Sequence, residues 1–180
     1  LDQAYIAYKD DKLSGKIGRQ VITMDTHRFV GDVGWRQDRQ TFDALTLGYQ
    51  LNEATKLTYA YLAKRNRIFS DDKDVDAKDH LLNIAHKFSN GTLTGYAYLL
   101  EEDKAGGAEI NTYGVRYAGA TDINDHKVTY SAEFAYQENE TADRDANYFA
   151  VEAGTKLSEL NVQVGYELLG SDTGKYGFTT

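Results

Sequence analysis

Alternation between apolar and polar residues runs through most of the chain, and it constrains the fold more than any other feature. In KVTYSAEFAYQ, residues 127–137, one face holds Tyr130 and Phe134 while the other holds Thr129 and Glu133. Successive side chains of a strand point to opposite faces, so this period predicts β-strands. We expect about ten strands, at 2–9, 15–23, 41–51, 56–65, 81–88, 92–100, 111–120, 127–137, 147–156 and 161–169.

The links between these strands alternate in length. Short links such as NEAT and SNG follow the odd strands, whereas long, charged links follow the even ones, at 24–40, 66–80, 101–110 and 137–146. Short turns at one end and long loops at the other are the plan of an outer-membrane β-barrel. A soluble barrel or sandwich also alternates, so the alternation by itself fits either water or lipid.

Composition narrows the function classes. The 14 Tyr and 16 Gly suit pleated sheet with aromatic girdles better than a helical domain. The chain has no Cys, which excludes disulfides and thiolate metal sites. A net charge of -8 argues against a nucleic-acid partner. No run of about 18 apolar residues is present to form a transmembrane helix.

We therefore predict an all-β protein, a transmembrane antiparallel up-and-down β-barrel with about ten strands in a single domain over residues 1–180. Short turns mark the periplasmic side of such barrels, so both ends of this chain would lie on the outer side. Intact bacterial barrels normally start and finish in the periplasm. We expect a fragment of a larger barrel, in which the strands at 2–9 and 161–169 are not paired with each other.

One face of the predicted sheet would contact lipid and the other would line the lumen. The expected lipid-facing residues share one parity: Val128, Tyr130, Phe134, Tyr136, Val162, Val164, Tyr166 and Leu168. Arg116, Glu133, Glu152 and Glu167 have the opposite parity, which indicates the lumen. Arg19 is placed there too, because a charge on the lipid face near the midplane is costly. Alternatively, these residues fill a wet interior without individual roles.

The stretch GRQVITMDTHRFVGDVGWRQDRQTFDA, residues 18–44, closely resembles a segment of the alginate-export family of Gram-negative outer-membrane porins. The pieces GTLTGYAYLL, TYGVRYAG, VGYELLG and GKYGF follow in the order and spacing of that family. The resemblance implies a channel in the bacterial outer membrane, not an enzyme, surrounded by lipid and lipopolysaccharide and permeable to small hydrophilic solutes. Members often carry a second arginine where this chain has Val21. We therefore do not expect alginate itself to be the solute of this chain, and any preference for anions or sugar acids would be mild.

Residues 24–40 combine three arginines with three aspartates. A polar loop of this kind can fold into a barrel lumen, where its charges set selectivity. We expect a constriction that includes Asp25, Arg28, Asp32, Arg36, Asp38 and Arg39. The alternative is a surface loop with solvated charges, in which each ion pair contributes under about 1 kcal/mol.

Two further functions are compatible with the sequence. His27 beside Asp25 could act as general base in a hydrolase at the barrel mouth, and a non-conducting structural or adhesive barrel could act through its acidic loops. Asp72, Asp74 and Asp76 match the start of an EF-hand loop, but Ala77 and Asn83 replace the required Gly and Glu. We predict no metal and no cofactor site. Two alternatives remain for this acidic loop. It could make a looser contact with Ca²⁺ that bridges to lipopolysaccharide, or its carboxylates could simply be solvated.

Overall fold

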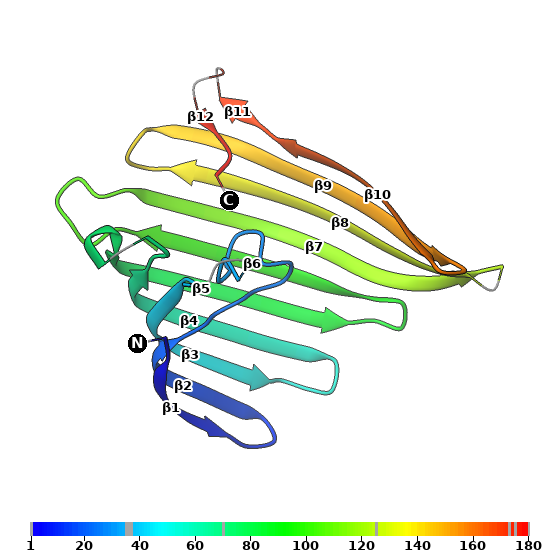
Figure 1. Cartoon of the computed structure of the whole chain (residues 1–180), viewed down its shortest axis with the longest axis horizontal. Coiled ribbons are helices and arrows are strands. Elements are labelled where there is room, and N and C mark those ends of the chain that lie inside the picture. The colour runs from blue at the N-terminus through cyan, green and yellow to red at the C-terminus, as the bar shows by residue number, and fades with distance from the viewer. Residues whose placement is uncertain are drawn as a thin grey trace.

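Ten antiparallel strands form one sheet in the computed structural model, which describes residues 2–34, 38–69, 71–124, 126–172, 174 and 176–179. The strands pair in chain order, as Figure 1 shows. They are β1 (Ala4–Lys9), β2 (Leu13–Gln20), β3 (Thr41–Gln50), β4 (Thr55–Asn66), β5 (Val75–Lys87), β6 (Gly91–Glu101), β7 (Glu109–Ile123), β8 (His126–Asn139), β9 (Arg144–Leu157) and β10 (Leu160–Leu169). A 3-10 helix, η1 (Asp71–Lys73), precedes β5, and a hairpin of β11 (Ser171–Asp172) and β12 (Tyr176–Gly177) follows β10. Among the described residues, no helix is long and apolar enough to span a membrane.

The ten predicted strands are all present, and the up-and-down order is confirmed. Three of the long links are shorter than predicted, most of all those before β5, which starts at Val75, and before β9, which starts at Arg144. The ladder continues there through polar pairs such as Lys64 with Asp76 and Glu138 with Asp145. Backbone pairing does not depend on an apolar side chain, so the hydrophobic pattern underestimates the length of these strands.

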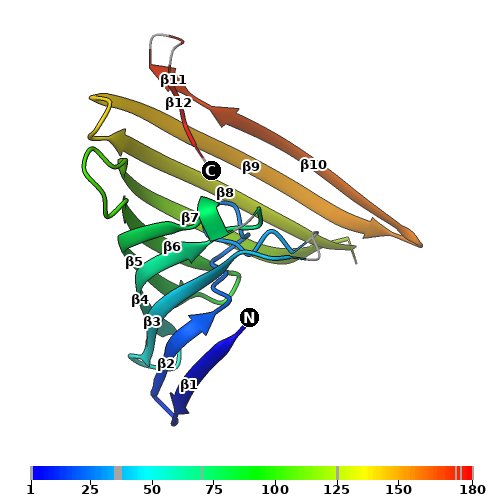
Figure 2. The same ribbon diagram turned by 60° about the vertical axis from the view of Figure 1, so that its left-hand side comes forward.

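The sheet curls without closing. Within the described residues β1 and β10 are its two edges and do not pair with each other, as expected. Figure 2 shows β1 to β3 on one side of the curl, β8 to β10 on the other, and the β2–β3 link between them. We call the ends of the strands that carry the β2–β3, β4–β5, β6–β7 and β8–β9 links the loop end, and the opposite ends the turn end.

The register assigns every strand residue to a face. Phe134 lies opposite Phe149, which lies opposite Leu168, and all three are exposed. The eight residues predicted to face lipid lie on this face, here called the outer face, so their shared orientation is confirmed. Their contact with lipid stays a prediction.

The buried core lies on the other side of the sheet, the inner face, beneath the β2–β3 link. Ile22, Met24 and Val30 of this link are buried against strand residues. The strand residues of the cluster are Phe42, Ala44, Ala60, Leu62, Leu81, Tyr96, Tyr98, Ala135, Ala146 and Tyr148, and Phe178 joins them from beyond β12. The link is thus packed against the inner face by apolar burial as well as by polar contacts.

We predict that tryptophan at position 134 is quenched by brominated lipids, whereas tryptophan at position 152 is not, because the two positions lie on opposite faces. Trp35 is the one native tryptophan and would be replaced by Phe in both variants. The measurement is the fluorescence of each variant folded into vesicles of brominated and unbrominated lipid. Quenching at position 152 and not at 134 would reverse the assignment of faces.

Candidate functional site

The β2–β3 link forms a compact turn before it crosses the inner face. The amide of His27 donates to the Met24 carbonyl at 2.9 Å, and the amide of Met24 donates to the Val30 carbonyl at 3.0 Å. Asp25 and His27 have left-handed backbone angles, φ 49° and 61°. Asp and His adopt this conformation more often than most residues do, so the sequence suits the turn that directs the following side chains onto the strands.

Asp25 ties this turn to the middle of the sheet. Its Oδ2 accepts hydrogen bonds from Asn83 Nδ2 on β5 at 3.0 Å and from Tyr98 Oη on β6 at 3.2 Å. Hydrogen bonds to a carboxylate are stronger than those between neutral groups. Asp25, one of the residues predicted for the lumen, therefore lies over the inner face.

Phe29 provides an aromatic contact farther along the link. Its ring centroid lies 5.7 Å from that of Tyr96 on β6, 5.3 Å from Tyr148 on β9 and 5.6 Å from Phe178. Tilted and edge-on pairs at these distances add to the burial of apolar surface. Phe29 thus packs the link against three aromatic residues that are far apart in the sequence.

Tyr96 lies across Gly114 and reaches a carboxylate on β8. Any Cβ at position 114 would overlap the Tyr96 ring. From this position Tyr96 Oη donates to Glu133 Oε1 at 2.8 Å, and Arg116 Nε lies 3.6 Å from Glu133 Oε2. Glu133, only 7% exposed, is therefore supplied with both a hydroxyl donor and a cation.

The link brings Arg28 to the same part of the inner face. Arg28 forms an ion pair with Glu167 on β10, and its guanidinium carbon lies 6.0 Å from the centre of the Tyr148 ring. The resulting cavity of about 310 Å³ is lined by ten residues besides Arg28: Thr26, Arg116, Ser131, Glu133, Tyr148, Ala150, Glu152, Gly165, Tyr166 and Glu167. Five of the residues predicted for the lumen thus meet around one cavity.

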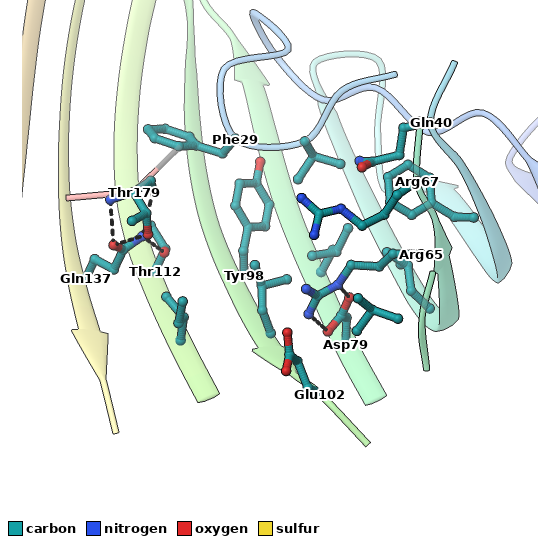
Figure 3. Close-up of a pocket in the computed structure, with 17 residues that line it drawn as sticks. Phe29, Gln40, Arg65, Arg67, Asp79, Tyr98, Glu102, Thr112, Gln137 and Thr179 are labelled. Atoms are coloured by element: carbon teal, nitrogen blue, oxygen red, sulfur yellow. Dashed lines mark hydrogen bonds and ion pairs between the residues drawn. The ribbon is translucent and has the colours of Figure 1, made fainter. Parts of the chain in front are cut away.

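A second cavity, of about 250 Å³, lies toward the loop end beyond the link, as Figure 3 shows. Arg65 Nε and Nη2 donate to the two carboxylate oxygens of Asp79 at 2.6 and 2.7 Å, and Asp79 is fully buried. On the other side of the cavity, Gln137 Nε2 donates to Thr112 Oγ1 and to the Thr179 carbonyl. The hydrophobic pattern does not indicate the pair of Arg65 and Asp79, because it assigns Asp79 to a link. The parity that Asp79 shares with Leu81 is the signal that indicates its inward orientation.

Arg67 also lines this second cavity and, within the described residues, forms no ion pair. Its guanidinium carbon lies 5.9 Å from the centre of the Phe69 ring. Glu102 at the rim is bound to Lys104 at 2.6 Å and accepts from the Ala108 amide, and these donors hold the pKa of Glu102 below its ordinary value.

The prediction that Arg19 faces the lumen is wrong. Arg19 is opposite Asp43 and binds it through Nε at 2.7 Å and Nη2 at 2.9 Å on the outer face, while the next residue, Gln20, is buried on the inner face. Asn66 Nδ2 also donates to Asp43 at 3.2 Å. The paired charges lie at the loop end of β2 and β3, away from the midplane, so the expected cost of an outer-face charge does not apply there in full.

The remaining predicted residues that the structure describes lie toward the loop end. Arg39 binds Asp2 through two hydrogen bonds of 2.9 and 2.6 Å, which hold the pKa of Asp2 below its ordinary value. The Asp32 carbonyl accepts from the Gln40 amide at 2.8 Å, and Asp38 is exposed. Arg36 lies outside the described residues.

Comparison with known proteins gives a family match and a structural likeness. The sequence matches the family described as Alginate export over residues 1–169. No curated protein matches the chain. Among solved structures, a loop L8 deletion mutant of OmpT, an outer membrane protein of Vibrio cholerae, matches with a TM-score of 0.50 and 14% identity, over 91% of this chain and 72% of that one. The predicted outer-membrane β-barrel fold and the bacterial outer-membrane location are confirmed.

Replacing Gly114 with Ala should lower stability, because the added Cβ displaces Tyr96 and breaks its hydrogen bond to Glu133. Overpacking of this kind costs about 1–3 kcal/mol. The matched control is Gly95→Ala, since a Cβ there would meet only Ile84 Cγ2, at an ordinary 3.6 Å. Denaturant unfolding of both variants in lipid vesicles tests the difference, and equal midpoints would contradict the role given to Gly114.

Proposed function

Because this chain belongs to the alginate-export family, we propose that it is a porin, a passive channel for small hydrophilic solutes across the bacterial outer membrane. One observation carries the proposal. The β2–β3 link is fixed across the inner face by Asp25, Arg28 and Phe29, and cavities lined by both charged and apolar residues lie on both of its sides. A link held in this way would narrow a water-filled lumen without closing it.

The cavities are suited to transit more than to tight binding. Three arginines that line them are already paired with carboxylates: Arg28 with Glu167, Arg116 with Glu133, and Arg65 with Asp79. A solute would have to compete with these pairs, so its contacts with these three arginines would be weak. Weak contacts at several sites permit throughput, and a preference for anions or sugar acids would remain mild.

The alternative of an enzyme at the barrel mouth has less support. The Asp25 carboxylate is engaged by Asn83 and Tyr98, and His27 is exposed on the turn. A general base needs a hydrogen-bonded orienting group and a substrate within reach. The position of Asp25 accounts for its role as an anchor of the link, and we therefore propose that the protein is not an enzyme.

Purified protein in planar bilayers should conduct ions. Replacing Arg28, Arg36 and Arg39 with Ser should shift the reversal potential in a salt gradient toward cations, because Glu167 then lacks its guanidinium partner. The single variant Arg28→Ser should give most of this shift. Arg39→Ser is the matched control, since Arg39 pairs with Asp2 at the loop end.

Absence of conductance would favour a structural or adhesive barrel. Conductance with an unchanged reversal potential in the triple variant would place the link outside the path of the permeating ions.

A further inference from the structure

A third cavity, of about 490 Å³, lies on the turn-end side of the link, against β2 to β5. Its charged lining residues are Lys16, Asp25 and Lys56, and its other lining residues are uncharged. The Asp25 carboxylate is directed to Asn83 and Tyr98, which are neutral. This cavity therefore carries a net positive charge.

The two lysines come from different strands but face the same space. Lys16 Nζ lies 4.4 Å above the Tyr5 ring on β1. Lys56 on β4 passes Gly48, where an added Cβ would meet Lys56 Cε at 3.7 Å. Within the described residues, neither ammonium group forms an ion pair. Their charge is available to a solute.

The cavity of about 310 Å³, on the other side of the link, has the opposite balance of charge. Its charged lining residues are two arginines and three glutamates. Arg28 pairs with Glu167 and Arg116 with Glu133, which leaves Glu152 as the third carboxylate. Glu152 Oε2 accepts one long hydrogen bond of 3.4 Å, from the neutral amide of Gln163. This cavity therefore carries a net negative charge.

The two cavities are on opposite sides of the curl. Lys16 and Lys56 project from β2 and β4, and Glu152 from β9, and Figure 2 shows β2 and β9 on the two sides with the link between them. Charges of opposite sign on facing low-dielectric walls produce a field across the space they enclose. The field would be directed from the wall of β2 and β4 to the wall of β9 and β10.

We propose that this pair of cavities selects zwitterionic solutes, small molecules that carry one anionic and one cationic group. This inference rests on the proposed channel function and names its substrate class. A zwitterion can place its anionic group toward Lys16 and Lys56 and its cationic group toward Glu152. A simple anion or cation is attracted by one wall and repelled by the other. A solute with both charges is attracted by both walls and therefore has the lowest free-energy barrier to permeation.

The test compares three solutes of similar size and fixed charge at neutral pH: taurine, isethionate and choline. Taurine is the zwitterion, and isethionate differs from it by a hydroxyl in place of the ammonium group. Efflux from proteoliposomes in symmetric potassium chloride should be about threefold faster for taurine than for either ion. The preference should fall in about 1 M salt, where the screening length is about 3 Å.

Two variants test the two walls separately. The double variant Lys16→Gln/Lys56→Gln should remove the taurine preference, slow isethionate and speed choline. Glu152→Gln should also remove the taurine preference, but it should speed the efflux of isethionate and slow that of choline. Lys73→Gln, on an exposed helix at the loop end, is the matched charge control and should change none of the three rates.

The outcomes separate the two proposals. If taurine is no faster than both ions, or if both wall variants shift the ions in the same direction, the zwitterion inference is overturned while the channel function stands. If the unmodified protein releases none of the solutes and conducts no ions in planar bilayers, the channel function fails first.

Discussion

Pairing of backbone N–H and C=O groups in an antiparallel ladder is the constraint on which this structure depends. Hydrocarbon offers these groups no other partners, so a chain in the outer membrane must satisfy them within the sheet. The ladder fixes the register, and the register separates the side chains into an outer and an inner face. Phe134 and Glu133 are neighbours in the chain but belong to different surroundings for this reason.

The β2–β3 link depends on that inner face. Asp25 supplies a carboxylate for donors on β5 and β6, Arg28 supplies a cation for β10, and Phe29 supplies a ring for β6 and β9. The three anchors differ in chemistry, so no single change in salt or pH weakens all of them. Ile22, Met24 and Val30 of the link are buried against the strands and keep it close to them.

The charges follow a related division. Toward the loop end, carboxylates and cations are mostly paired, as in Arg65 with Asp79, Lys78 with Asp103 and Arg19 with Asp43. On the turn-end side of the link, Lys16, Lys56 and Glu152 form no ion pair with any other residue that the structure describes. Unpaired charges on a water-filled surface act over roughly a Debye length, about 8 Å at physiological salt. They are therefore the groups most able to distinguish one passing solute from another.

The sequence by itself determined the ten strands, their order and the faces of the strands with clear alternation, because a period of two is a local property of the chain. It also indicated the family, through the motif of residues 18–44. Only the tertiary structure decided which charges meet. Asp25 and Tyr98 are 73 positions apart, and Arg65 and Asp79 pair across a link whose length the pattern overestimated. Arg19 shows the reason most directly. The free-energy cost of a charge on the outer face depends on the depth of that charge in the membrane and on a partner such as Asp43. Both are set by how the strands align, not by the residues next to Arg19 in the chain.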